Sequence, residues 1–519
     1  MPDREDTIIA ALAAPWPADA AAISLRVEAA AARGDAETDL DLDLDETGPD
    51  DAVRWAPGAQ DSLFGAPDAS ASEAPARTIA AALSNAARQP SAETFAHLYA
   101  RLEGAEAVSL VDQVLPRVAE ESAAYRGLIA ALARRILREA PHVEPVKFSI
   151  ALLGVFGAPD DEAAILAIGA HDEFTLFSAV ALSNLSPDAE SAIWRLAQSV
   201  HGWGRIQAVE RLRHTTKPAI KDWLLRRGWK NSVMVEYLAH LCATTGGLKA
   251  ALEAPRVDPD LLAGASALID ALIAGGPAED IADYADGPGV LRAYLDHVAR
   301  SPACDLQRLL VCKRIQDLVS GDARIAHWPA QAKWTLRTKA AAELARPEWR
   351  TLAETRLRSE EEGAFNLAAD AIEALGGDAW PARFEKQRTG GANQWWALTQ
   401  TEDADRMAAI IALALETLDL EAIAGPAMRI LPAGAESALD WILQALRRFP
   451  GMGWPLIAAG FRGQAIRVRN MAIFALNAWP RDAWPPDAMR LLREAEMREP
   501  DAAARRRFAA LRAGVLDES

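Results

Sequence analysis

The chain has 519 residues, of which half are hydrophobic and a quarter are charged, a balance typical of a folded globular protein. Its net charge of −18 is unevenly distributed. Residues 1–76 contain 17 acidic and 4 basic residues, a net charge of −13, whereas residues 77–519 contain 56 acidic and 51 basic residues, a net charge of −5. The longest apolar run, at 407–415, is far shorter than the ~20 residues of a membrane span. The acidic start, MPDRED, lacks the positive region of a signal peptide. These features predict a cytoplasmic protein with no membrane partner.

The three cysteines, Cys242, Cys304 and Cys312, form no C-x-x-C motif. Their odd number and wide spacing argue against a disulfide framework and against a structural zinc site. We expect buried, apolar thiols.

Residues 1–76 differ in composition from the rest of the chain and are expected to form a largely flexible segment, acidic and rich in Pro, Gly and Ala. Within it, residues 23–34 could form a short amphipathic helix, and the acidic run DLDLDLDE follows at 39–46. The stretch RWAPGAQDSLFGAP, which carries Trp55 and Phe64, has two interpretations. It is either a short docking motif or part of a tail that lies loosely over its own body.

Residues 77–519 have the pattern of successive helices, with apolar residues at three- and four-residue steps and Pro, Gly or Asp every 10–15 residues. The stretch NLAADAIEALGGDAWP at 366–381 recurs in register as NMAIFALNAWPRDAWP at 470–485. Alanines at matching offsets in the two copies would let one helix lie close against the next. The shared Asp-Ala-Trp-Pro predicts a turn, with the proline at or near the first turn of the following helix.

A second register supports a repeated unit. Ala151, Ala181, Ala208 and Ala239 occupy comparable places in helical patterns, at spacings of 30, 27 and 31 residues. Recurrence of a two-helix unit at about 30 residues is typical of an α-solenoid. The predicted fold is therefore all-α: a right-handed α-solenoid of stacked antiparallel helix pairs over residues 77–519.

These units resemble HEAT repeats, or the similar bacterial HEAT-like repeats. The resemblance rests on patterns such as IRVRNMAIFALNAW (466–479) and GRIQAVERL (204–212) and extends over residues 90–500. It implies an extended surface that contacts partners through many residues.

Many of the 16 tryptophans fall near predicted helix ends, where they would fill gaps between stacked helices. Trp395 and Trp396 are adjacent, so they cannot share one helix face. One of the two is expected to be exposed to a partner.

The sequence lacks the phosphate-binding motif G-x-x-x-x-G-K-[ST], the nucleophile elbow G-x-S-x-G and the zinc-protease motif H-E-x-x-H. It indicates no catalytic, cofactor-binding or metal-ligating residue. Two pairs, Glu93 with His97 and Glu236 with His240, are one helical turn apart, but each would need further ligands to hold a metal. No cofactor is predicted.

The basic segment, residues 201–230, is the strongest candidate for a binding surface. It holds eight basic and two acidic residues and interleaves tryptophans with them; the basic residues are Arg205, Arg211, Arg213, Lys217, Lys221, Arg226, Arg227 and Lys230. Three interpretations stay open: arginines that bond neighbouring carboxylates, a latch for the acidic run at 39–46, and a docking surface for an acidic peptide or a phosphate backbone. Nucleic acid is the least favoured partner, because the body as a whole is not basic.

Residues 202–248 also resemble a group of bacterial HEAT-repeat proteins, some of which carry the label limonene hydroxylase. That label implies a monooxygenase, although no residue of this sequence matches a catalytic motif. The predicted function is a non-enzymatic scaffold or adaptor that binds a protein or an acidic peptide, or the chain's own N-terminal segment. The alternative is an enzyme, either such a monooxygenase or a nucleic-acid-acting protein.

Overall fold

The structure is a computed structural model that describes residues 4–33, 56–63, 69–301, 305–425 and 431–516, the side chains of 63, 69–72 and 123 excepted. These residues form 30 α-helices, and their one β-feature is an isolated bridge between Ala424 and Gly463. The predicted all-α class is confirmed for this part of the chain. None of the helices described there has the length and apolar character required to cross a membrane.

The described residues divide into two compact units, with the boundary along the chain after Ala345, except that residues 305–310 group with the second unit. The helices up to that point are α1 (Arg4–Ala10), α2 (Ile23–Arg33), α3 (Ala59–Leu63), α4 (Ala69–Arg88), α5 (Ala92–Glu103), α6 (Ala107–Glu121), α7 (Arg126–Glu139), α8 (Val143–Phe156), α9 (Glu162–Gly169), α10 (Asp172–Leu185), α11 (Ala189–Ser199), α12 (Trp203–Glu210), α13 (Pro218–Trp223), α14 (Glu236–Gly246), α15 (Leu248–Glu253), α16 (Pro259–Ala274), α17 (Gly287–Arg300), α18 (Leu306–Gly321) and α19 (Ala330–Leu344).

The second unit contains α20 (Pro347–Arg356), α21 (Glu362–Ala374), α22 (Trp380–Arg388), α23 (Trp395–Thr399), α24 (Ala404–Thr417), α25 (Leu420–Ile423), α26 (Ala435–Leu446), α27 (Trp454–Gly460), α28 (Ile466–Asn477), α29 (Ala488–Arg498) and α30 (Ala502–Ala513). Short 3₁₀ or π segments join some of these helices; the π segment, η3, spans Leu224–Gly228.

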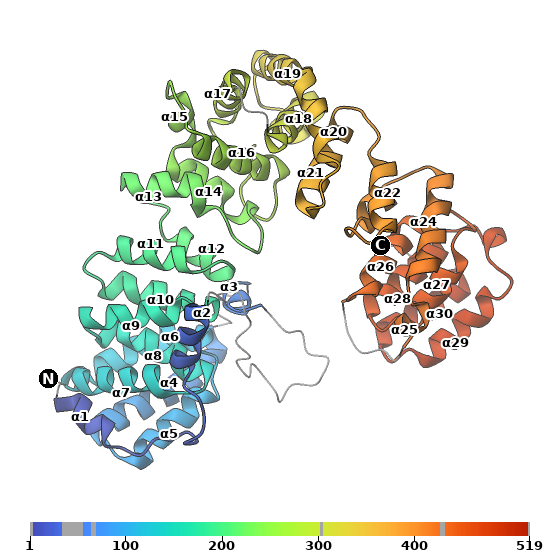
Figure 1. The fold of residues 1–519 in the computed structure, drawn as a ribbon. Helices are drawn as coiled ribbons and strands as arrows, with labels where there is room; N and C mark the ends of the chain where they lie inside the picture. The colour runs from blue at the N-terminus through green and yellow to red at the C-terminus, as the bar shows by residue number, and fades with distance from the viewer. Residues whose placement is uncertain (1–3, 34–55, 64–68, 302–304, 426–430, 517–519) are drawn as a thin grey trace. The chain divides into compact units, whose positions relative to one another are not determined.

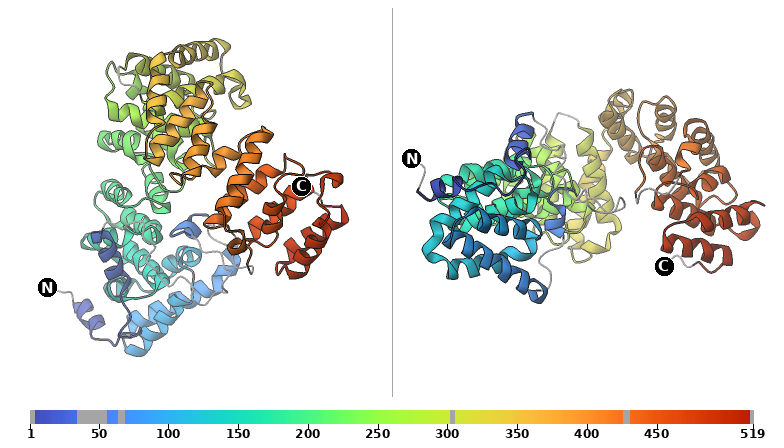
Figure 2. Two further views of the ribbon diagram at one scale, coloured as in Figure 1. Left: turned by 45° about the vertical axis from the view of Figure 1, so that its right-hand side comes forward. Right: turned by 90° about the horizontal axis from the view of Figure 1, so that it is seen from below.

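In the first unit the even-numbered helices from α4 to α16 pack each against the next even-numbered one (Figure 1). The odd-numbered helices α5, α7, α9 and α11 each pack beside one of them. Two further views show these helices following one another in chain order through the unit (Figure 2). In the second unit α26 packs against α28, and α28 against α30. Packing between next-but-one helices therefore recurs in both units.

The alanine register falls on successive members of the even-numbered series. Ala151, Ala181, Ala208 and Ala239 lie on α8, α10, α12 and α14, and the last three are buried. Small residues bring these helices close together. A Cβ added at Gly154 of α8 would lie 2.7 Å from the Cα of Ala181 on α10, closer than two carbon atoms can pack.

The echoed stretches lie at the same place in two helices of the second unit. Ala368 and Ala371 on α21, and Ala472 and Ala475 on α28, are fully buried, as the small-residue pattern predicts. The proline of the first copy, Pro381, lies in the first turn of α22, as expected. The proline of the second copy differs, because a 3₁₀ segment at Arg481–Ala483 intervenes and α29 begins only at Ala488.

We predict that Ala472→Leu lowers the free energy of unfolding by about 1–3 kcal/mol, since extra atoms must separate packed helices. Ala472 is fully buried on α28, and a Cβ built on Gly460 of α27 would lie 2.9 Å from the Cβ of Ala472. Urea unfolding would measure the change. Ala478→Leu is the matched control, because Ala478 is exposed just after the same helix. Equal stability of the two variants would contradict close packing at Ala472.

The described parts of residues 1–76, predicted to be largely flexible, form helices that pack on the body. α1 packs against α7, and α2 packs against α7 and α9. Ile9, Ile23 and Val27 are buried there, which supplies the apolar burial that ordering needs. The predicted boundary at residue 76 falls inside α4. The acidic run at 39–46, Trp55 and Phe64 lie outside the described residues.

Candidate functional site

The basic segment forms α12, α13 and η3 and the turns around them. Three of its cations are bound to carboxylates of neighbouring helices. Lys217 Nζ lies 2.6 Å from Asp188 at the start of α11. Arg226 donates two hydrogen bonds, of 2.7 and 2.8 Å, to Asp258 at the start of α16, and Arg227 donates one of 3.1 Å to Asp260. These cations therefore link helices to one another.

Asp188 and Asp258 are also the N-caps of their helices, and their side chains accept backbone N–H groups there. The hydrogen bonds from Arg226 hold the pKa of Asp258 well below its usual range, and those to Asp258 and Asp222 raise the pKa of Arg226. The first interpretation, arginines that bond neighbouring carboxylates, accounts for these residues.

Arg205 is buried and is not available to a partner. Its guanidinium donates to the carbonyls of Ala197 and Val200, which end α11, and to the carbonyl of Arg227 at 2.9 Å. It also lies over the Trp223 ring, 4.8 Å from the centroid. Burial lowers the pKa of Arg205 to about 10. A contact to an external anion would require this arrangement to open.

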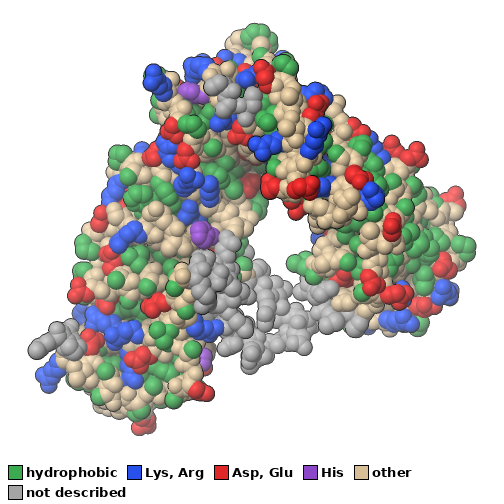
Figure 3. Space-filling model, in the orientation of Figure 1, with side chains coloured by type: hydrophobic (Ala, Val, Ile, Leu, Met, Phe, Trp, Pro, Cys, Tyr) green, Lys and Arg blue, Asp and Glu red, His purple; other side chains and the backbone are tan. Residues whose placement is uncertain are grey.

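The other four basic residues of the segment are less constrained. Arg211 is half-buried and donates to the carbonyl of Gln207. Among the described residues, Arg213, Lys221 and Lys230 have no carboxylate partner; Arg213 bonds a backbone carbonyl, and Lys230 lies over the Trp229 ring. On the face drawn in Figure 3, basic and acidic side chains are interspersed, without one continuous basic area.

Of the two adjacent tryptophans, one is buried and the other is exposed, as predicted. Trp395 is 5% exposed and belongs to the core of the second unit, whereas Trp396 is 56% exposed. Adjacent positions on α23 point to different sides of the helix.

The described part of the chain contains no cluster of three His, Cys, Asp or Glu residues placed to hold a metal ion. His201, Glu210 and His214 of the basic segment are titratable residues whose enclosure in one pocket would indicate a catalytic site, and all three are exposed. Cys242 and Cys312 are buried, and burial raises the pKa of the Cys242 thiol. Cys304 lies outside the described residues.

A second candidate site lies where α3 packs on α10 and α12, beside α8 (Figure 1). We call the groups that hold α3 the α3 seat: Lys147 on α8, Asp172 and Glu173 on α10, and Gln207 on α12. The segment they hold, residues 56–62, includes the centre of the stretch singled out as a docking motif. Ala59 and Asp61 are buried in the seat, whereas Gln60 is exposed.

The ion pairs of the seat centre on one buried ammonium. Lys147 is 3% exposed, and its Nζ lies 2.6 Å from Glu173, 2.9 Å from Asp61 and 3.4 Å from Glu144. Glu144 also accepts the backbone N–H of Ala107 at 2.5 Å. Three carboxylates thus surround one ammonium, and α3 contributes one of the three.

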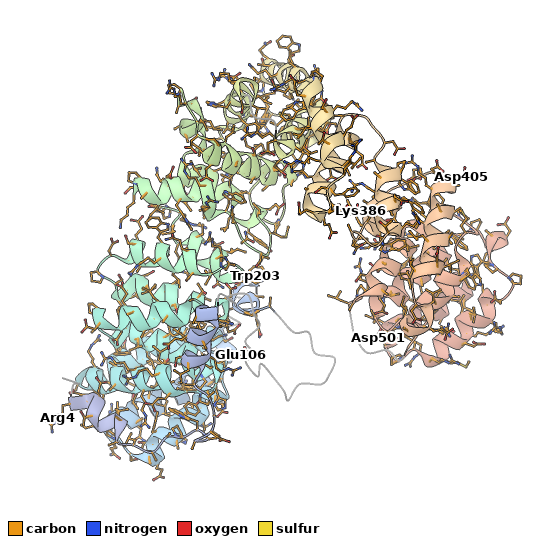
Figure 4. The ribbon with its side chains drawn as sticks, viewed as in Figure 1. Arg4, Glu106, Trp203, Lys386, Asp405 and Asp501 are labelled. Atoms are coloured by element: carbon orange, nitrogen blue, oxygen red, sulfur yellow. The ribbon has the colours of Figure 1, made fainter. Side chains whose placement is uncertain are left out.

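The seat also forms hydrogen bonds with the backbone of the segment at Gly58. Glu173 Oε2 accepts the N–H of Gly58 at 2.8 Å, and Gln207 donates to the Gly58 carbonyl and to the Ser62 hydroxyl. Gly58 has a φ of +72°, and a Cβ there would lie 2.5 Å from the Asp172 carbonyl oxygen and 3.5 Å from Trp203. Trp203 is labelled beside α3 in Figure 4. Glycine is therefore required for both conformation and space.

Burial raises the pKa of Asp61 and of Glu144 above their ordinary values, although Lys147 acts in the opposite direction. Burial alone would lower the pKa of Lys147, but the surrounding carboxylates outweigh it and raise that pKa. The Lys147 ammonium therefore stays charged at neutral pH. The raised pKa values of Asp61 and Glu144 make these carboxyl groups easier to protonate than in water.

We predict that α3 is held more tightly at pH 5 than at pH 8. A raised carboxyl pKa stabilises the docked state at acidic pH, and this contribution is lost as the pH rises through the docked-state pKa. The contribution of Lys147 is constant over this range, since it is lost only above the usual lysine pKa. Hydrogen-exchange mass spectrometry over residues 56–63, corrected for intrinsic rates, would measure the opening, with α16 as the internal control. Greater protection at pH 8 would contradict the assignment.

Only part of this seat can be predicted from the sequence. Trp55 and Phe64 distinguish the stretch around Gly58, whereas the contacts that the structure describes come from Gly58, Asp61 and Ser62. Lys147, Glu173 and Gln207 belong to three helices and share no local motif. No protein-family model, curated protein or solved structure matches this chain.

Proposed function

We propose that this chain is a HEAT-like α-solenoid scaffold that binds a short peptide segment of a partner protein on the helices of its first unit. The observation that carries the proposal is the α3 seat, where the helical body holds residues 56–62 through side chains from three helices. An isolated helix shorter than ~12–15 residues is marginal in water. The five residues of α3 therefore owe their order to the seat.

The packing pattern supports the solenoid part of the proposal. Each even-numbered helix from α4 to α16 packs on the next, and the alanine register follows the same series. A stacked array of this kind offers a long surface built from many helices. The exposed cations Arg213 and Lys230 and the half-buried Lys221 add positive charge near α12 that an acidic partner would contact.

The test is affinity capture with the immobilised full chain, followed by cross-linking and mass spectrometry. We expect a partner held in stoichiometric amount, with cross-links to α8–α14. The matched variant is Lys221→Glu with Lys230→Glu, which breaks no ion pair among the described residues and should reduce retention of an acidic partner. Arg226 and Arg227 are less suitable, because their reversal would also break the ion pairs to Asp258 and Asp260. Failure to retain any protein at stoichiometric level would overturn the scaffold function.

A further inference from the structure

We infer that the α3 seat is the partner-binding site of the first unit and that residues 56–62 occupy it as a competitor in cis. The partner peptide would share the chemistry of the segment: a glycine, an aspartate three residues later, and a serine directly after the aspartate. This inference rests on the proposed scaffold function and adds the recognition chemistry and its regulation.

The first argument is that the helical body does not need α3 for its own packing. α8 packs directly on α10, and α10 directly on α12, so the helices that form the seat contact one another without the segment. The segment is separated along the chain from α2, which ends at Arg33, and from α4, which begins at Ala69. It therefore enters the seat as a short, separate peptide.

The second argument is that the contacts define a motif. Gly58 lies directly before the short helix, and Asp61 and Ser62 are adjacent residues on it. Gly58 contacts Glu173, Asp61 contacts Lys147 and Ser62 contacts Gln207, whereas Gln60 is exposed. A peptide needs only these three positions, in this spacing, to make the same contacts.

The third argument concerns charge. Without α3, Lys147 keeps two carboxylate neighbours, Glu144 and Glu173. Such a seat accepts one more carboxylate, whereas Glu144 and Glu173 would repel a peptide that brings several carboxylates. The partner peptide should therefore carry a single aspartate at the central position. The acidic run at 39–46 has the wrong pattern for this seat, since it contains no glycine.

Competition in cis follows from tethering. A segment linked to its own site has an effective concentration in the millimolar range for short linkers, so it weakens any free peptide of similar intrinsic affinity. The apparent dissociation constant is the intrinsic constant divided by the fraction of molecules whose seat is open. A change that ejects the segment but leaves the seat intact should therefore strengthen the binding of free peptide.

The experiment titrates a fluorescein-labelled peptide of residues 56–63, APGAQDSL, with the full chain and two variants, read by fluorescence anisotropy. Gly58→Val should eject the segment, because the new Cβ would meet the Asp172 carbonyl at 2.5 Å and the backbone φ is +72°. Gln60→Val is the matched control, because Gln60 is exposed on the same short helix. We expect Gly58→Val to bind the peptide about tenfold more tightly, or better, than the unaltered chain. Gln60→Val should bind it as the unaltered chain does.

Two further peptides test the chemistry on the Gly58→Val chain. A peptide with Asp61→Lys should not bind, since it would place two ammonium groups together, and a peptide of residues 39–46 should not bind either. Binding of all three peptides alike would overturn the proposed motif.

Unchanged peptide affinity in a folded Gly58→Val chain, with folding checked by far-UV circular dichroism, would overturn the competition. If Gly58→Val does not fold, Asp61→Lys in the chain replaces it as the ejecting variant. Loss of the fold in both would overturn the proposal too, because a competitor must leave its seat intact. Peptide binding as expected, with no protein captured by the full chain, would overturn only the scaffold function.

Discussion

Lys147→Met should lower the free energy of unfolding of the first unit by about 3–5 kcal/mol at pH 7, because it leaves buried carboxylates without a counter-charge. Lys147 Nζ lies within ion-pair distance of Asp61, Glu144 and Glu173, and Lys147 itself is 3% exposed. Methionine has a similar length and keeps the apolar packing of the stem. Urea unfolding followed by circular dichroism would measure the loss.

The pH dependence separates a charge effect from a packing effect. The loss should be smaller at pH 5 than at pH 8, since the carboxylates left without Lys147 can take up protons at acidic pH. Lys221→Met is the control, because Lys221 is half-buried and has no carboxylate partner among the described residues; its effect should stay within about 0.5 kcal/mol. A loss that is equal at both pH values would show that packing, rather than charge, explains it.

Arg469→Met should have a comparable effect in the second unit, about 3–5 kcal/mol. Arg469 on α28 forms two hydrogen bonds, of 2.6 and 2.9 Å, with Glu499 after α29, and both side chains are buried. Its Nη1 also donates to the carbonyls of Gly463 and Gln464. Removal of the guanidinium would leave a buried carboxylate and two carbonyls without their partner.

A double variant tests this explanation. Arg469→Met combined with Glu499→Leu removes both charges, so it should recover part of the stability lost by Arg469→Met alone. Arg462→Met is the control in the same unit, because Arg462 is exposed and its side chain has no partner among the described residues. A double variant no more stable than Arg469→Met would mean that the orphaned carboxylate is not the cause.

The local features of the fold could be predicted from the sequence because they depend on neighbouring residues. Helical periodicity predicted the all-α class, and the alanines of the register fell on α8, α10, α12 and α14. The small residues of the two echoed stretches are buried because each helix must approach the next. The adjacent tryptophans divide into one buried and one exposed residue because of helix geometry alone.

The candidate sites were harder to predict because their contacts join distant parts of the chain. The basic segment was recognised by its composition, but composition does not show that Arg205 is buried or that Arg226 is bound to Asp258. The carboxylate partners lie at the starts of helices about 30 residues away, where they also serve as N-caps. Periodicity predicts a helix and its cap without predicting which cation reaches that cap.

Local spacing and side-chain size are enough to predict that the chain forms helices and which of their faces are buried. The pairing of charges, and the contact between residues 56–62 and Lys147, depend instead on how distant helices pack together. Gly58 and Glu173 are 115 residues apart, yet they share a hydrogen bond. That contact depends on how three helices stack, and its strength on the burial of charges that no local pattern brings together.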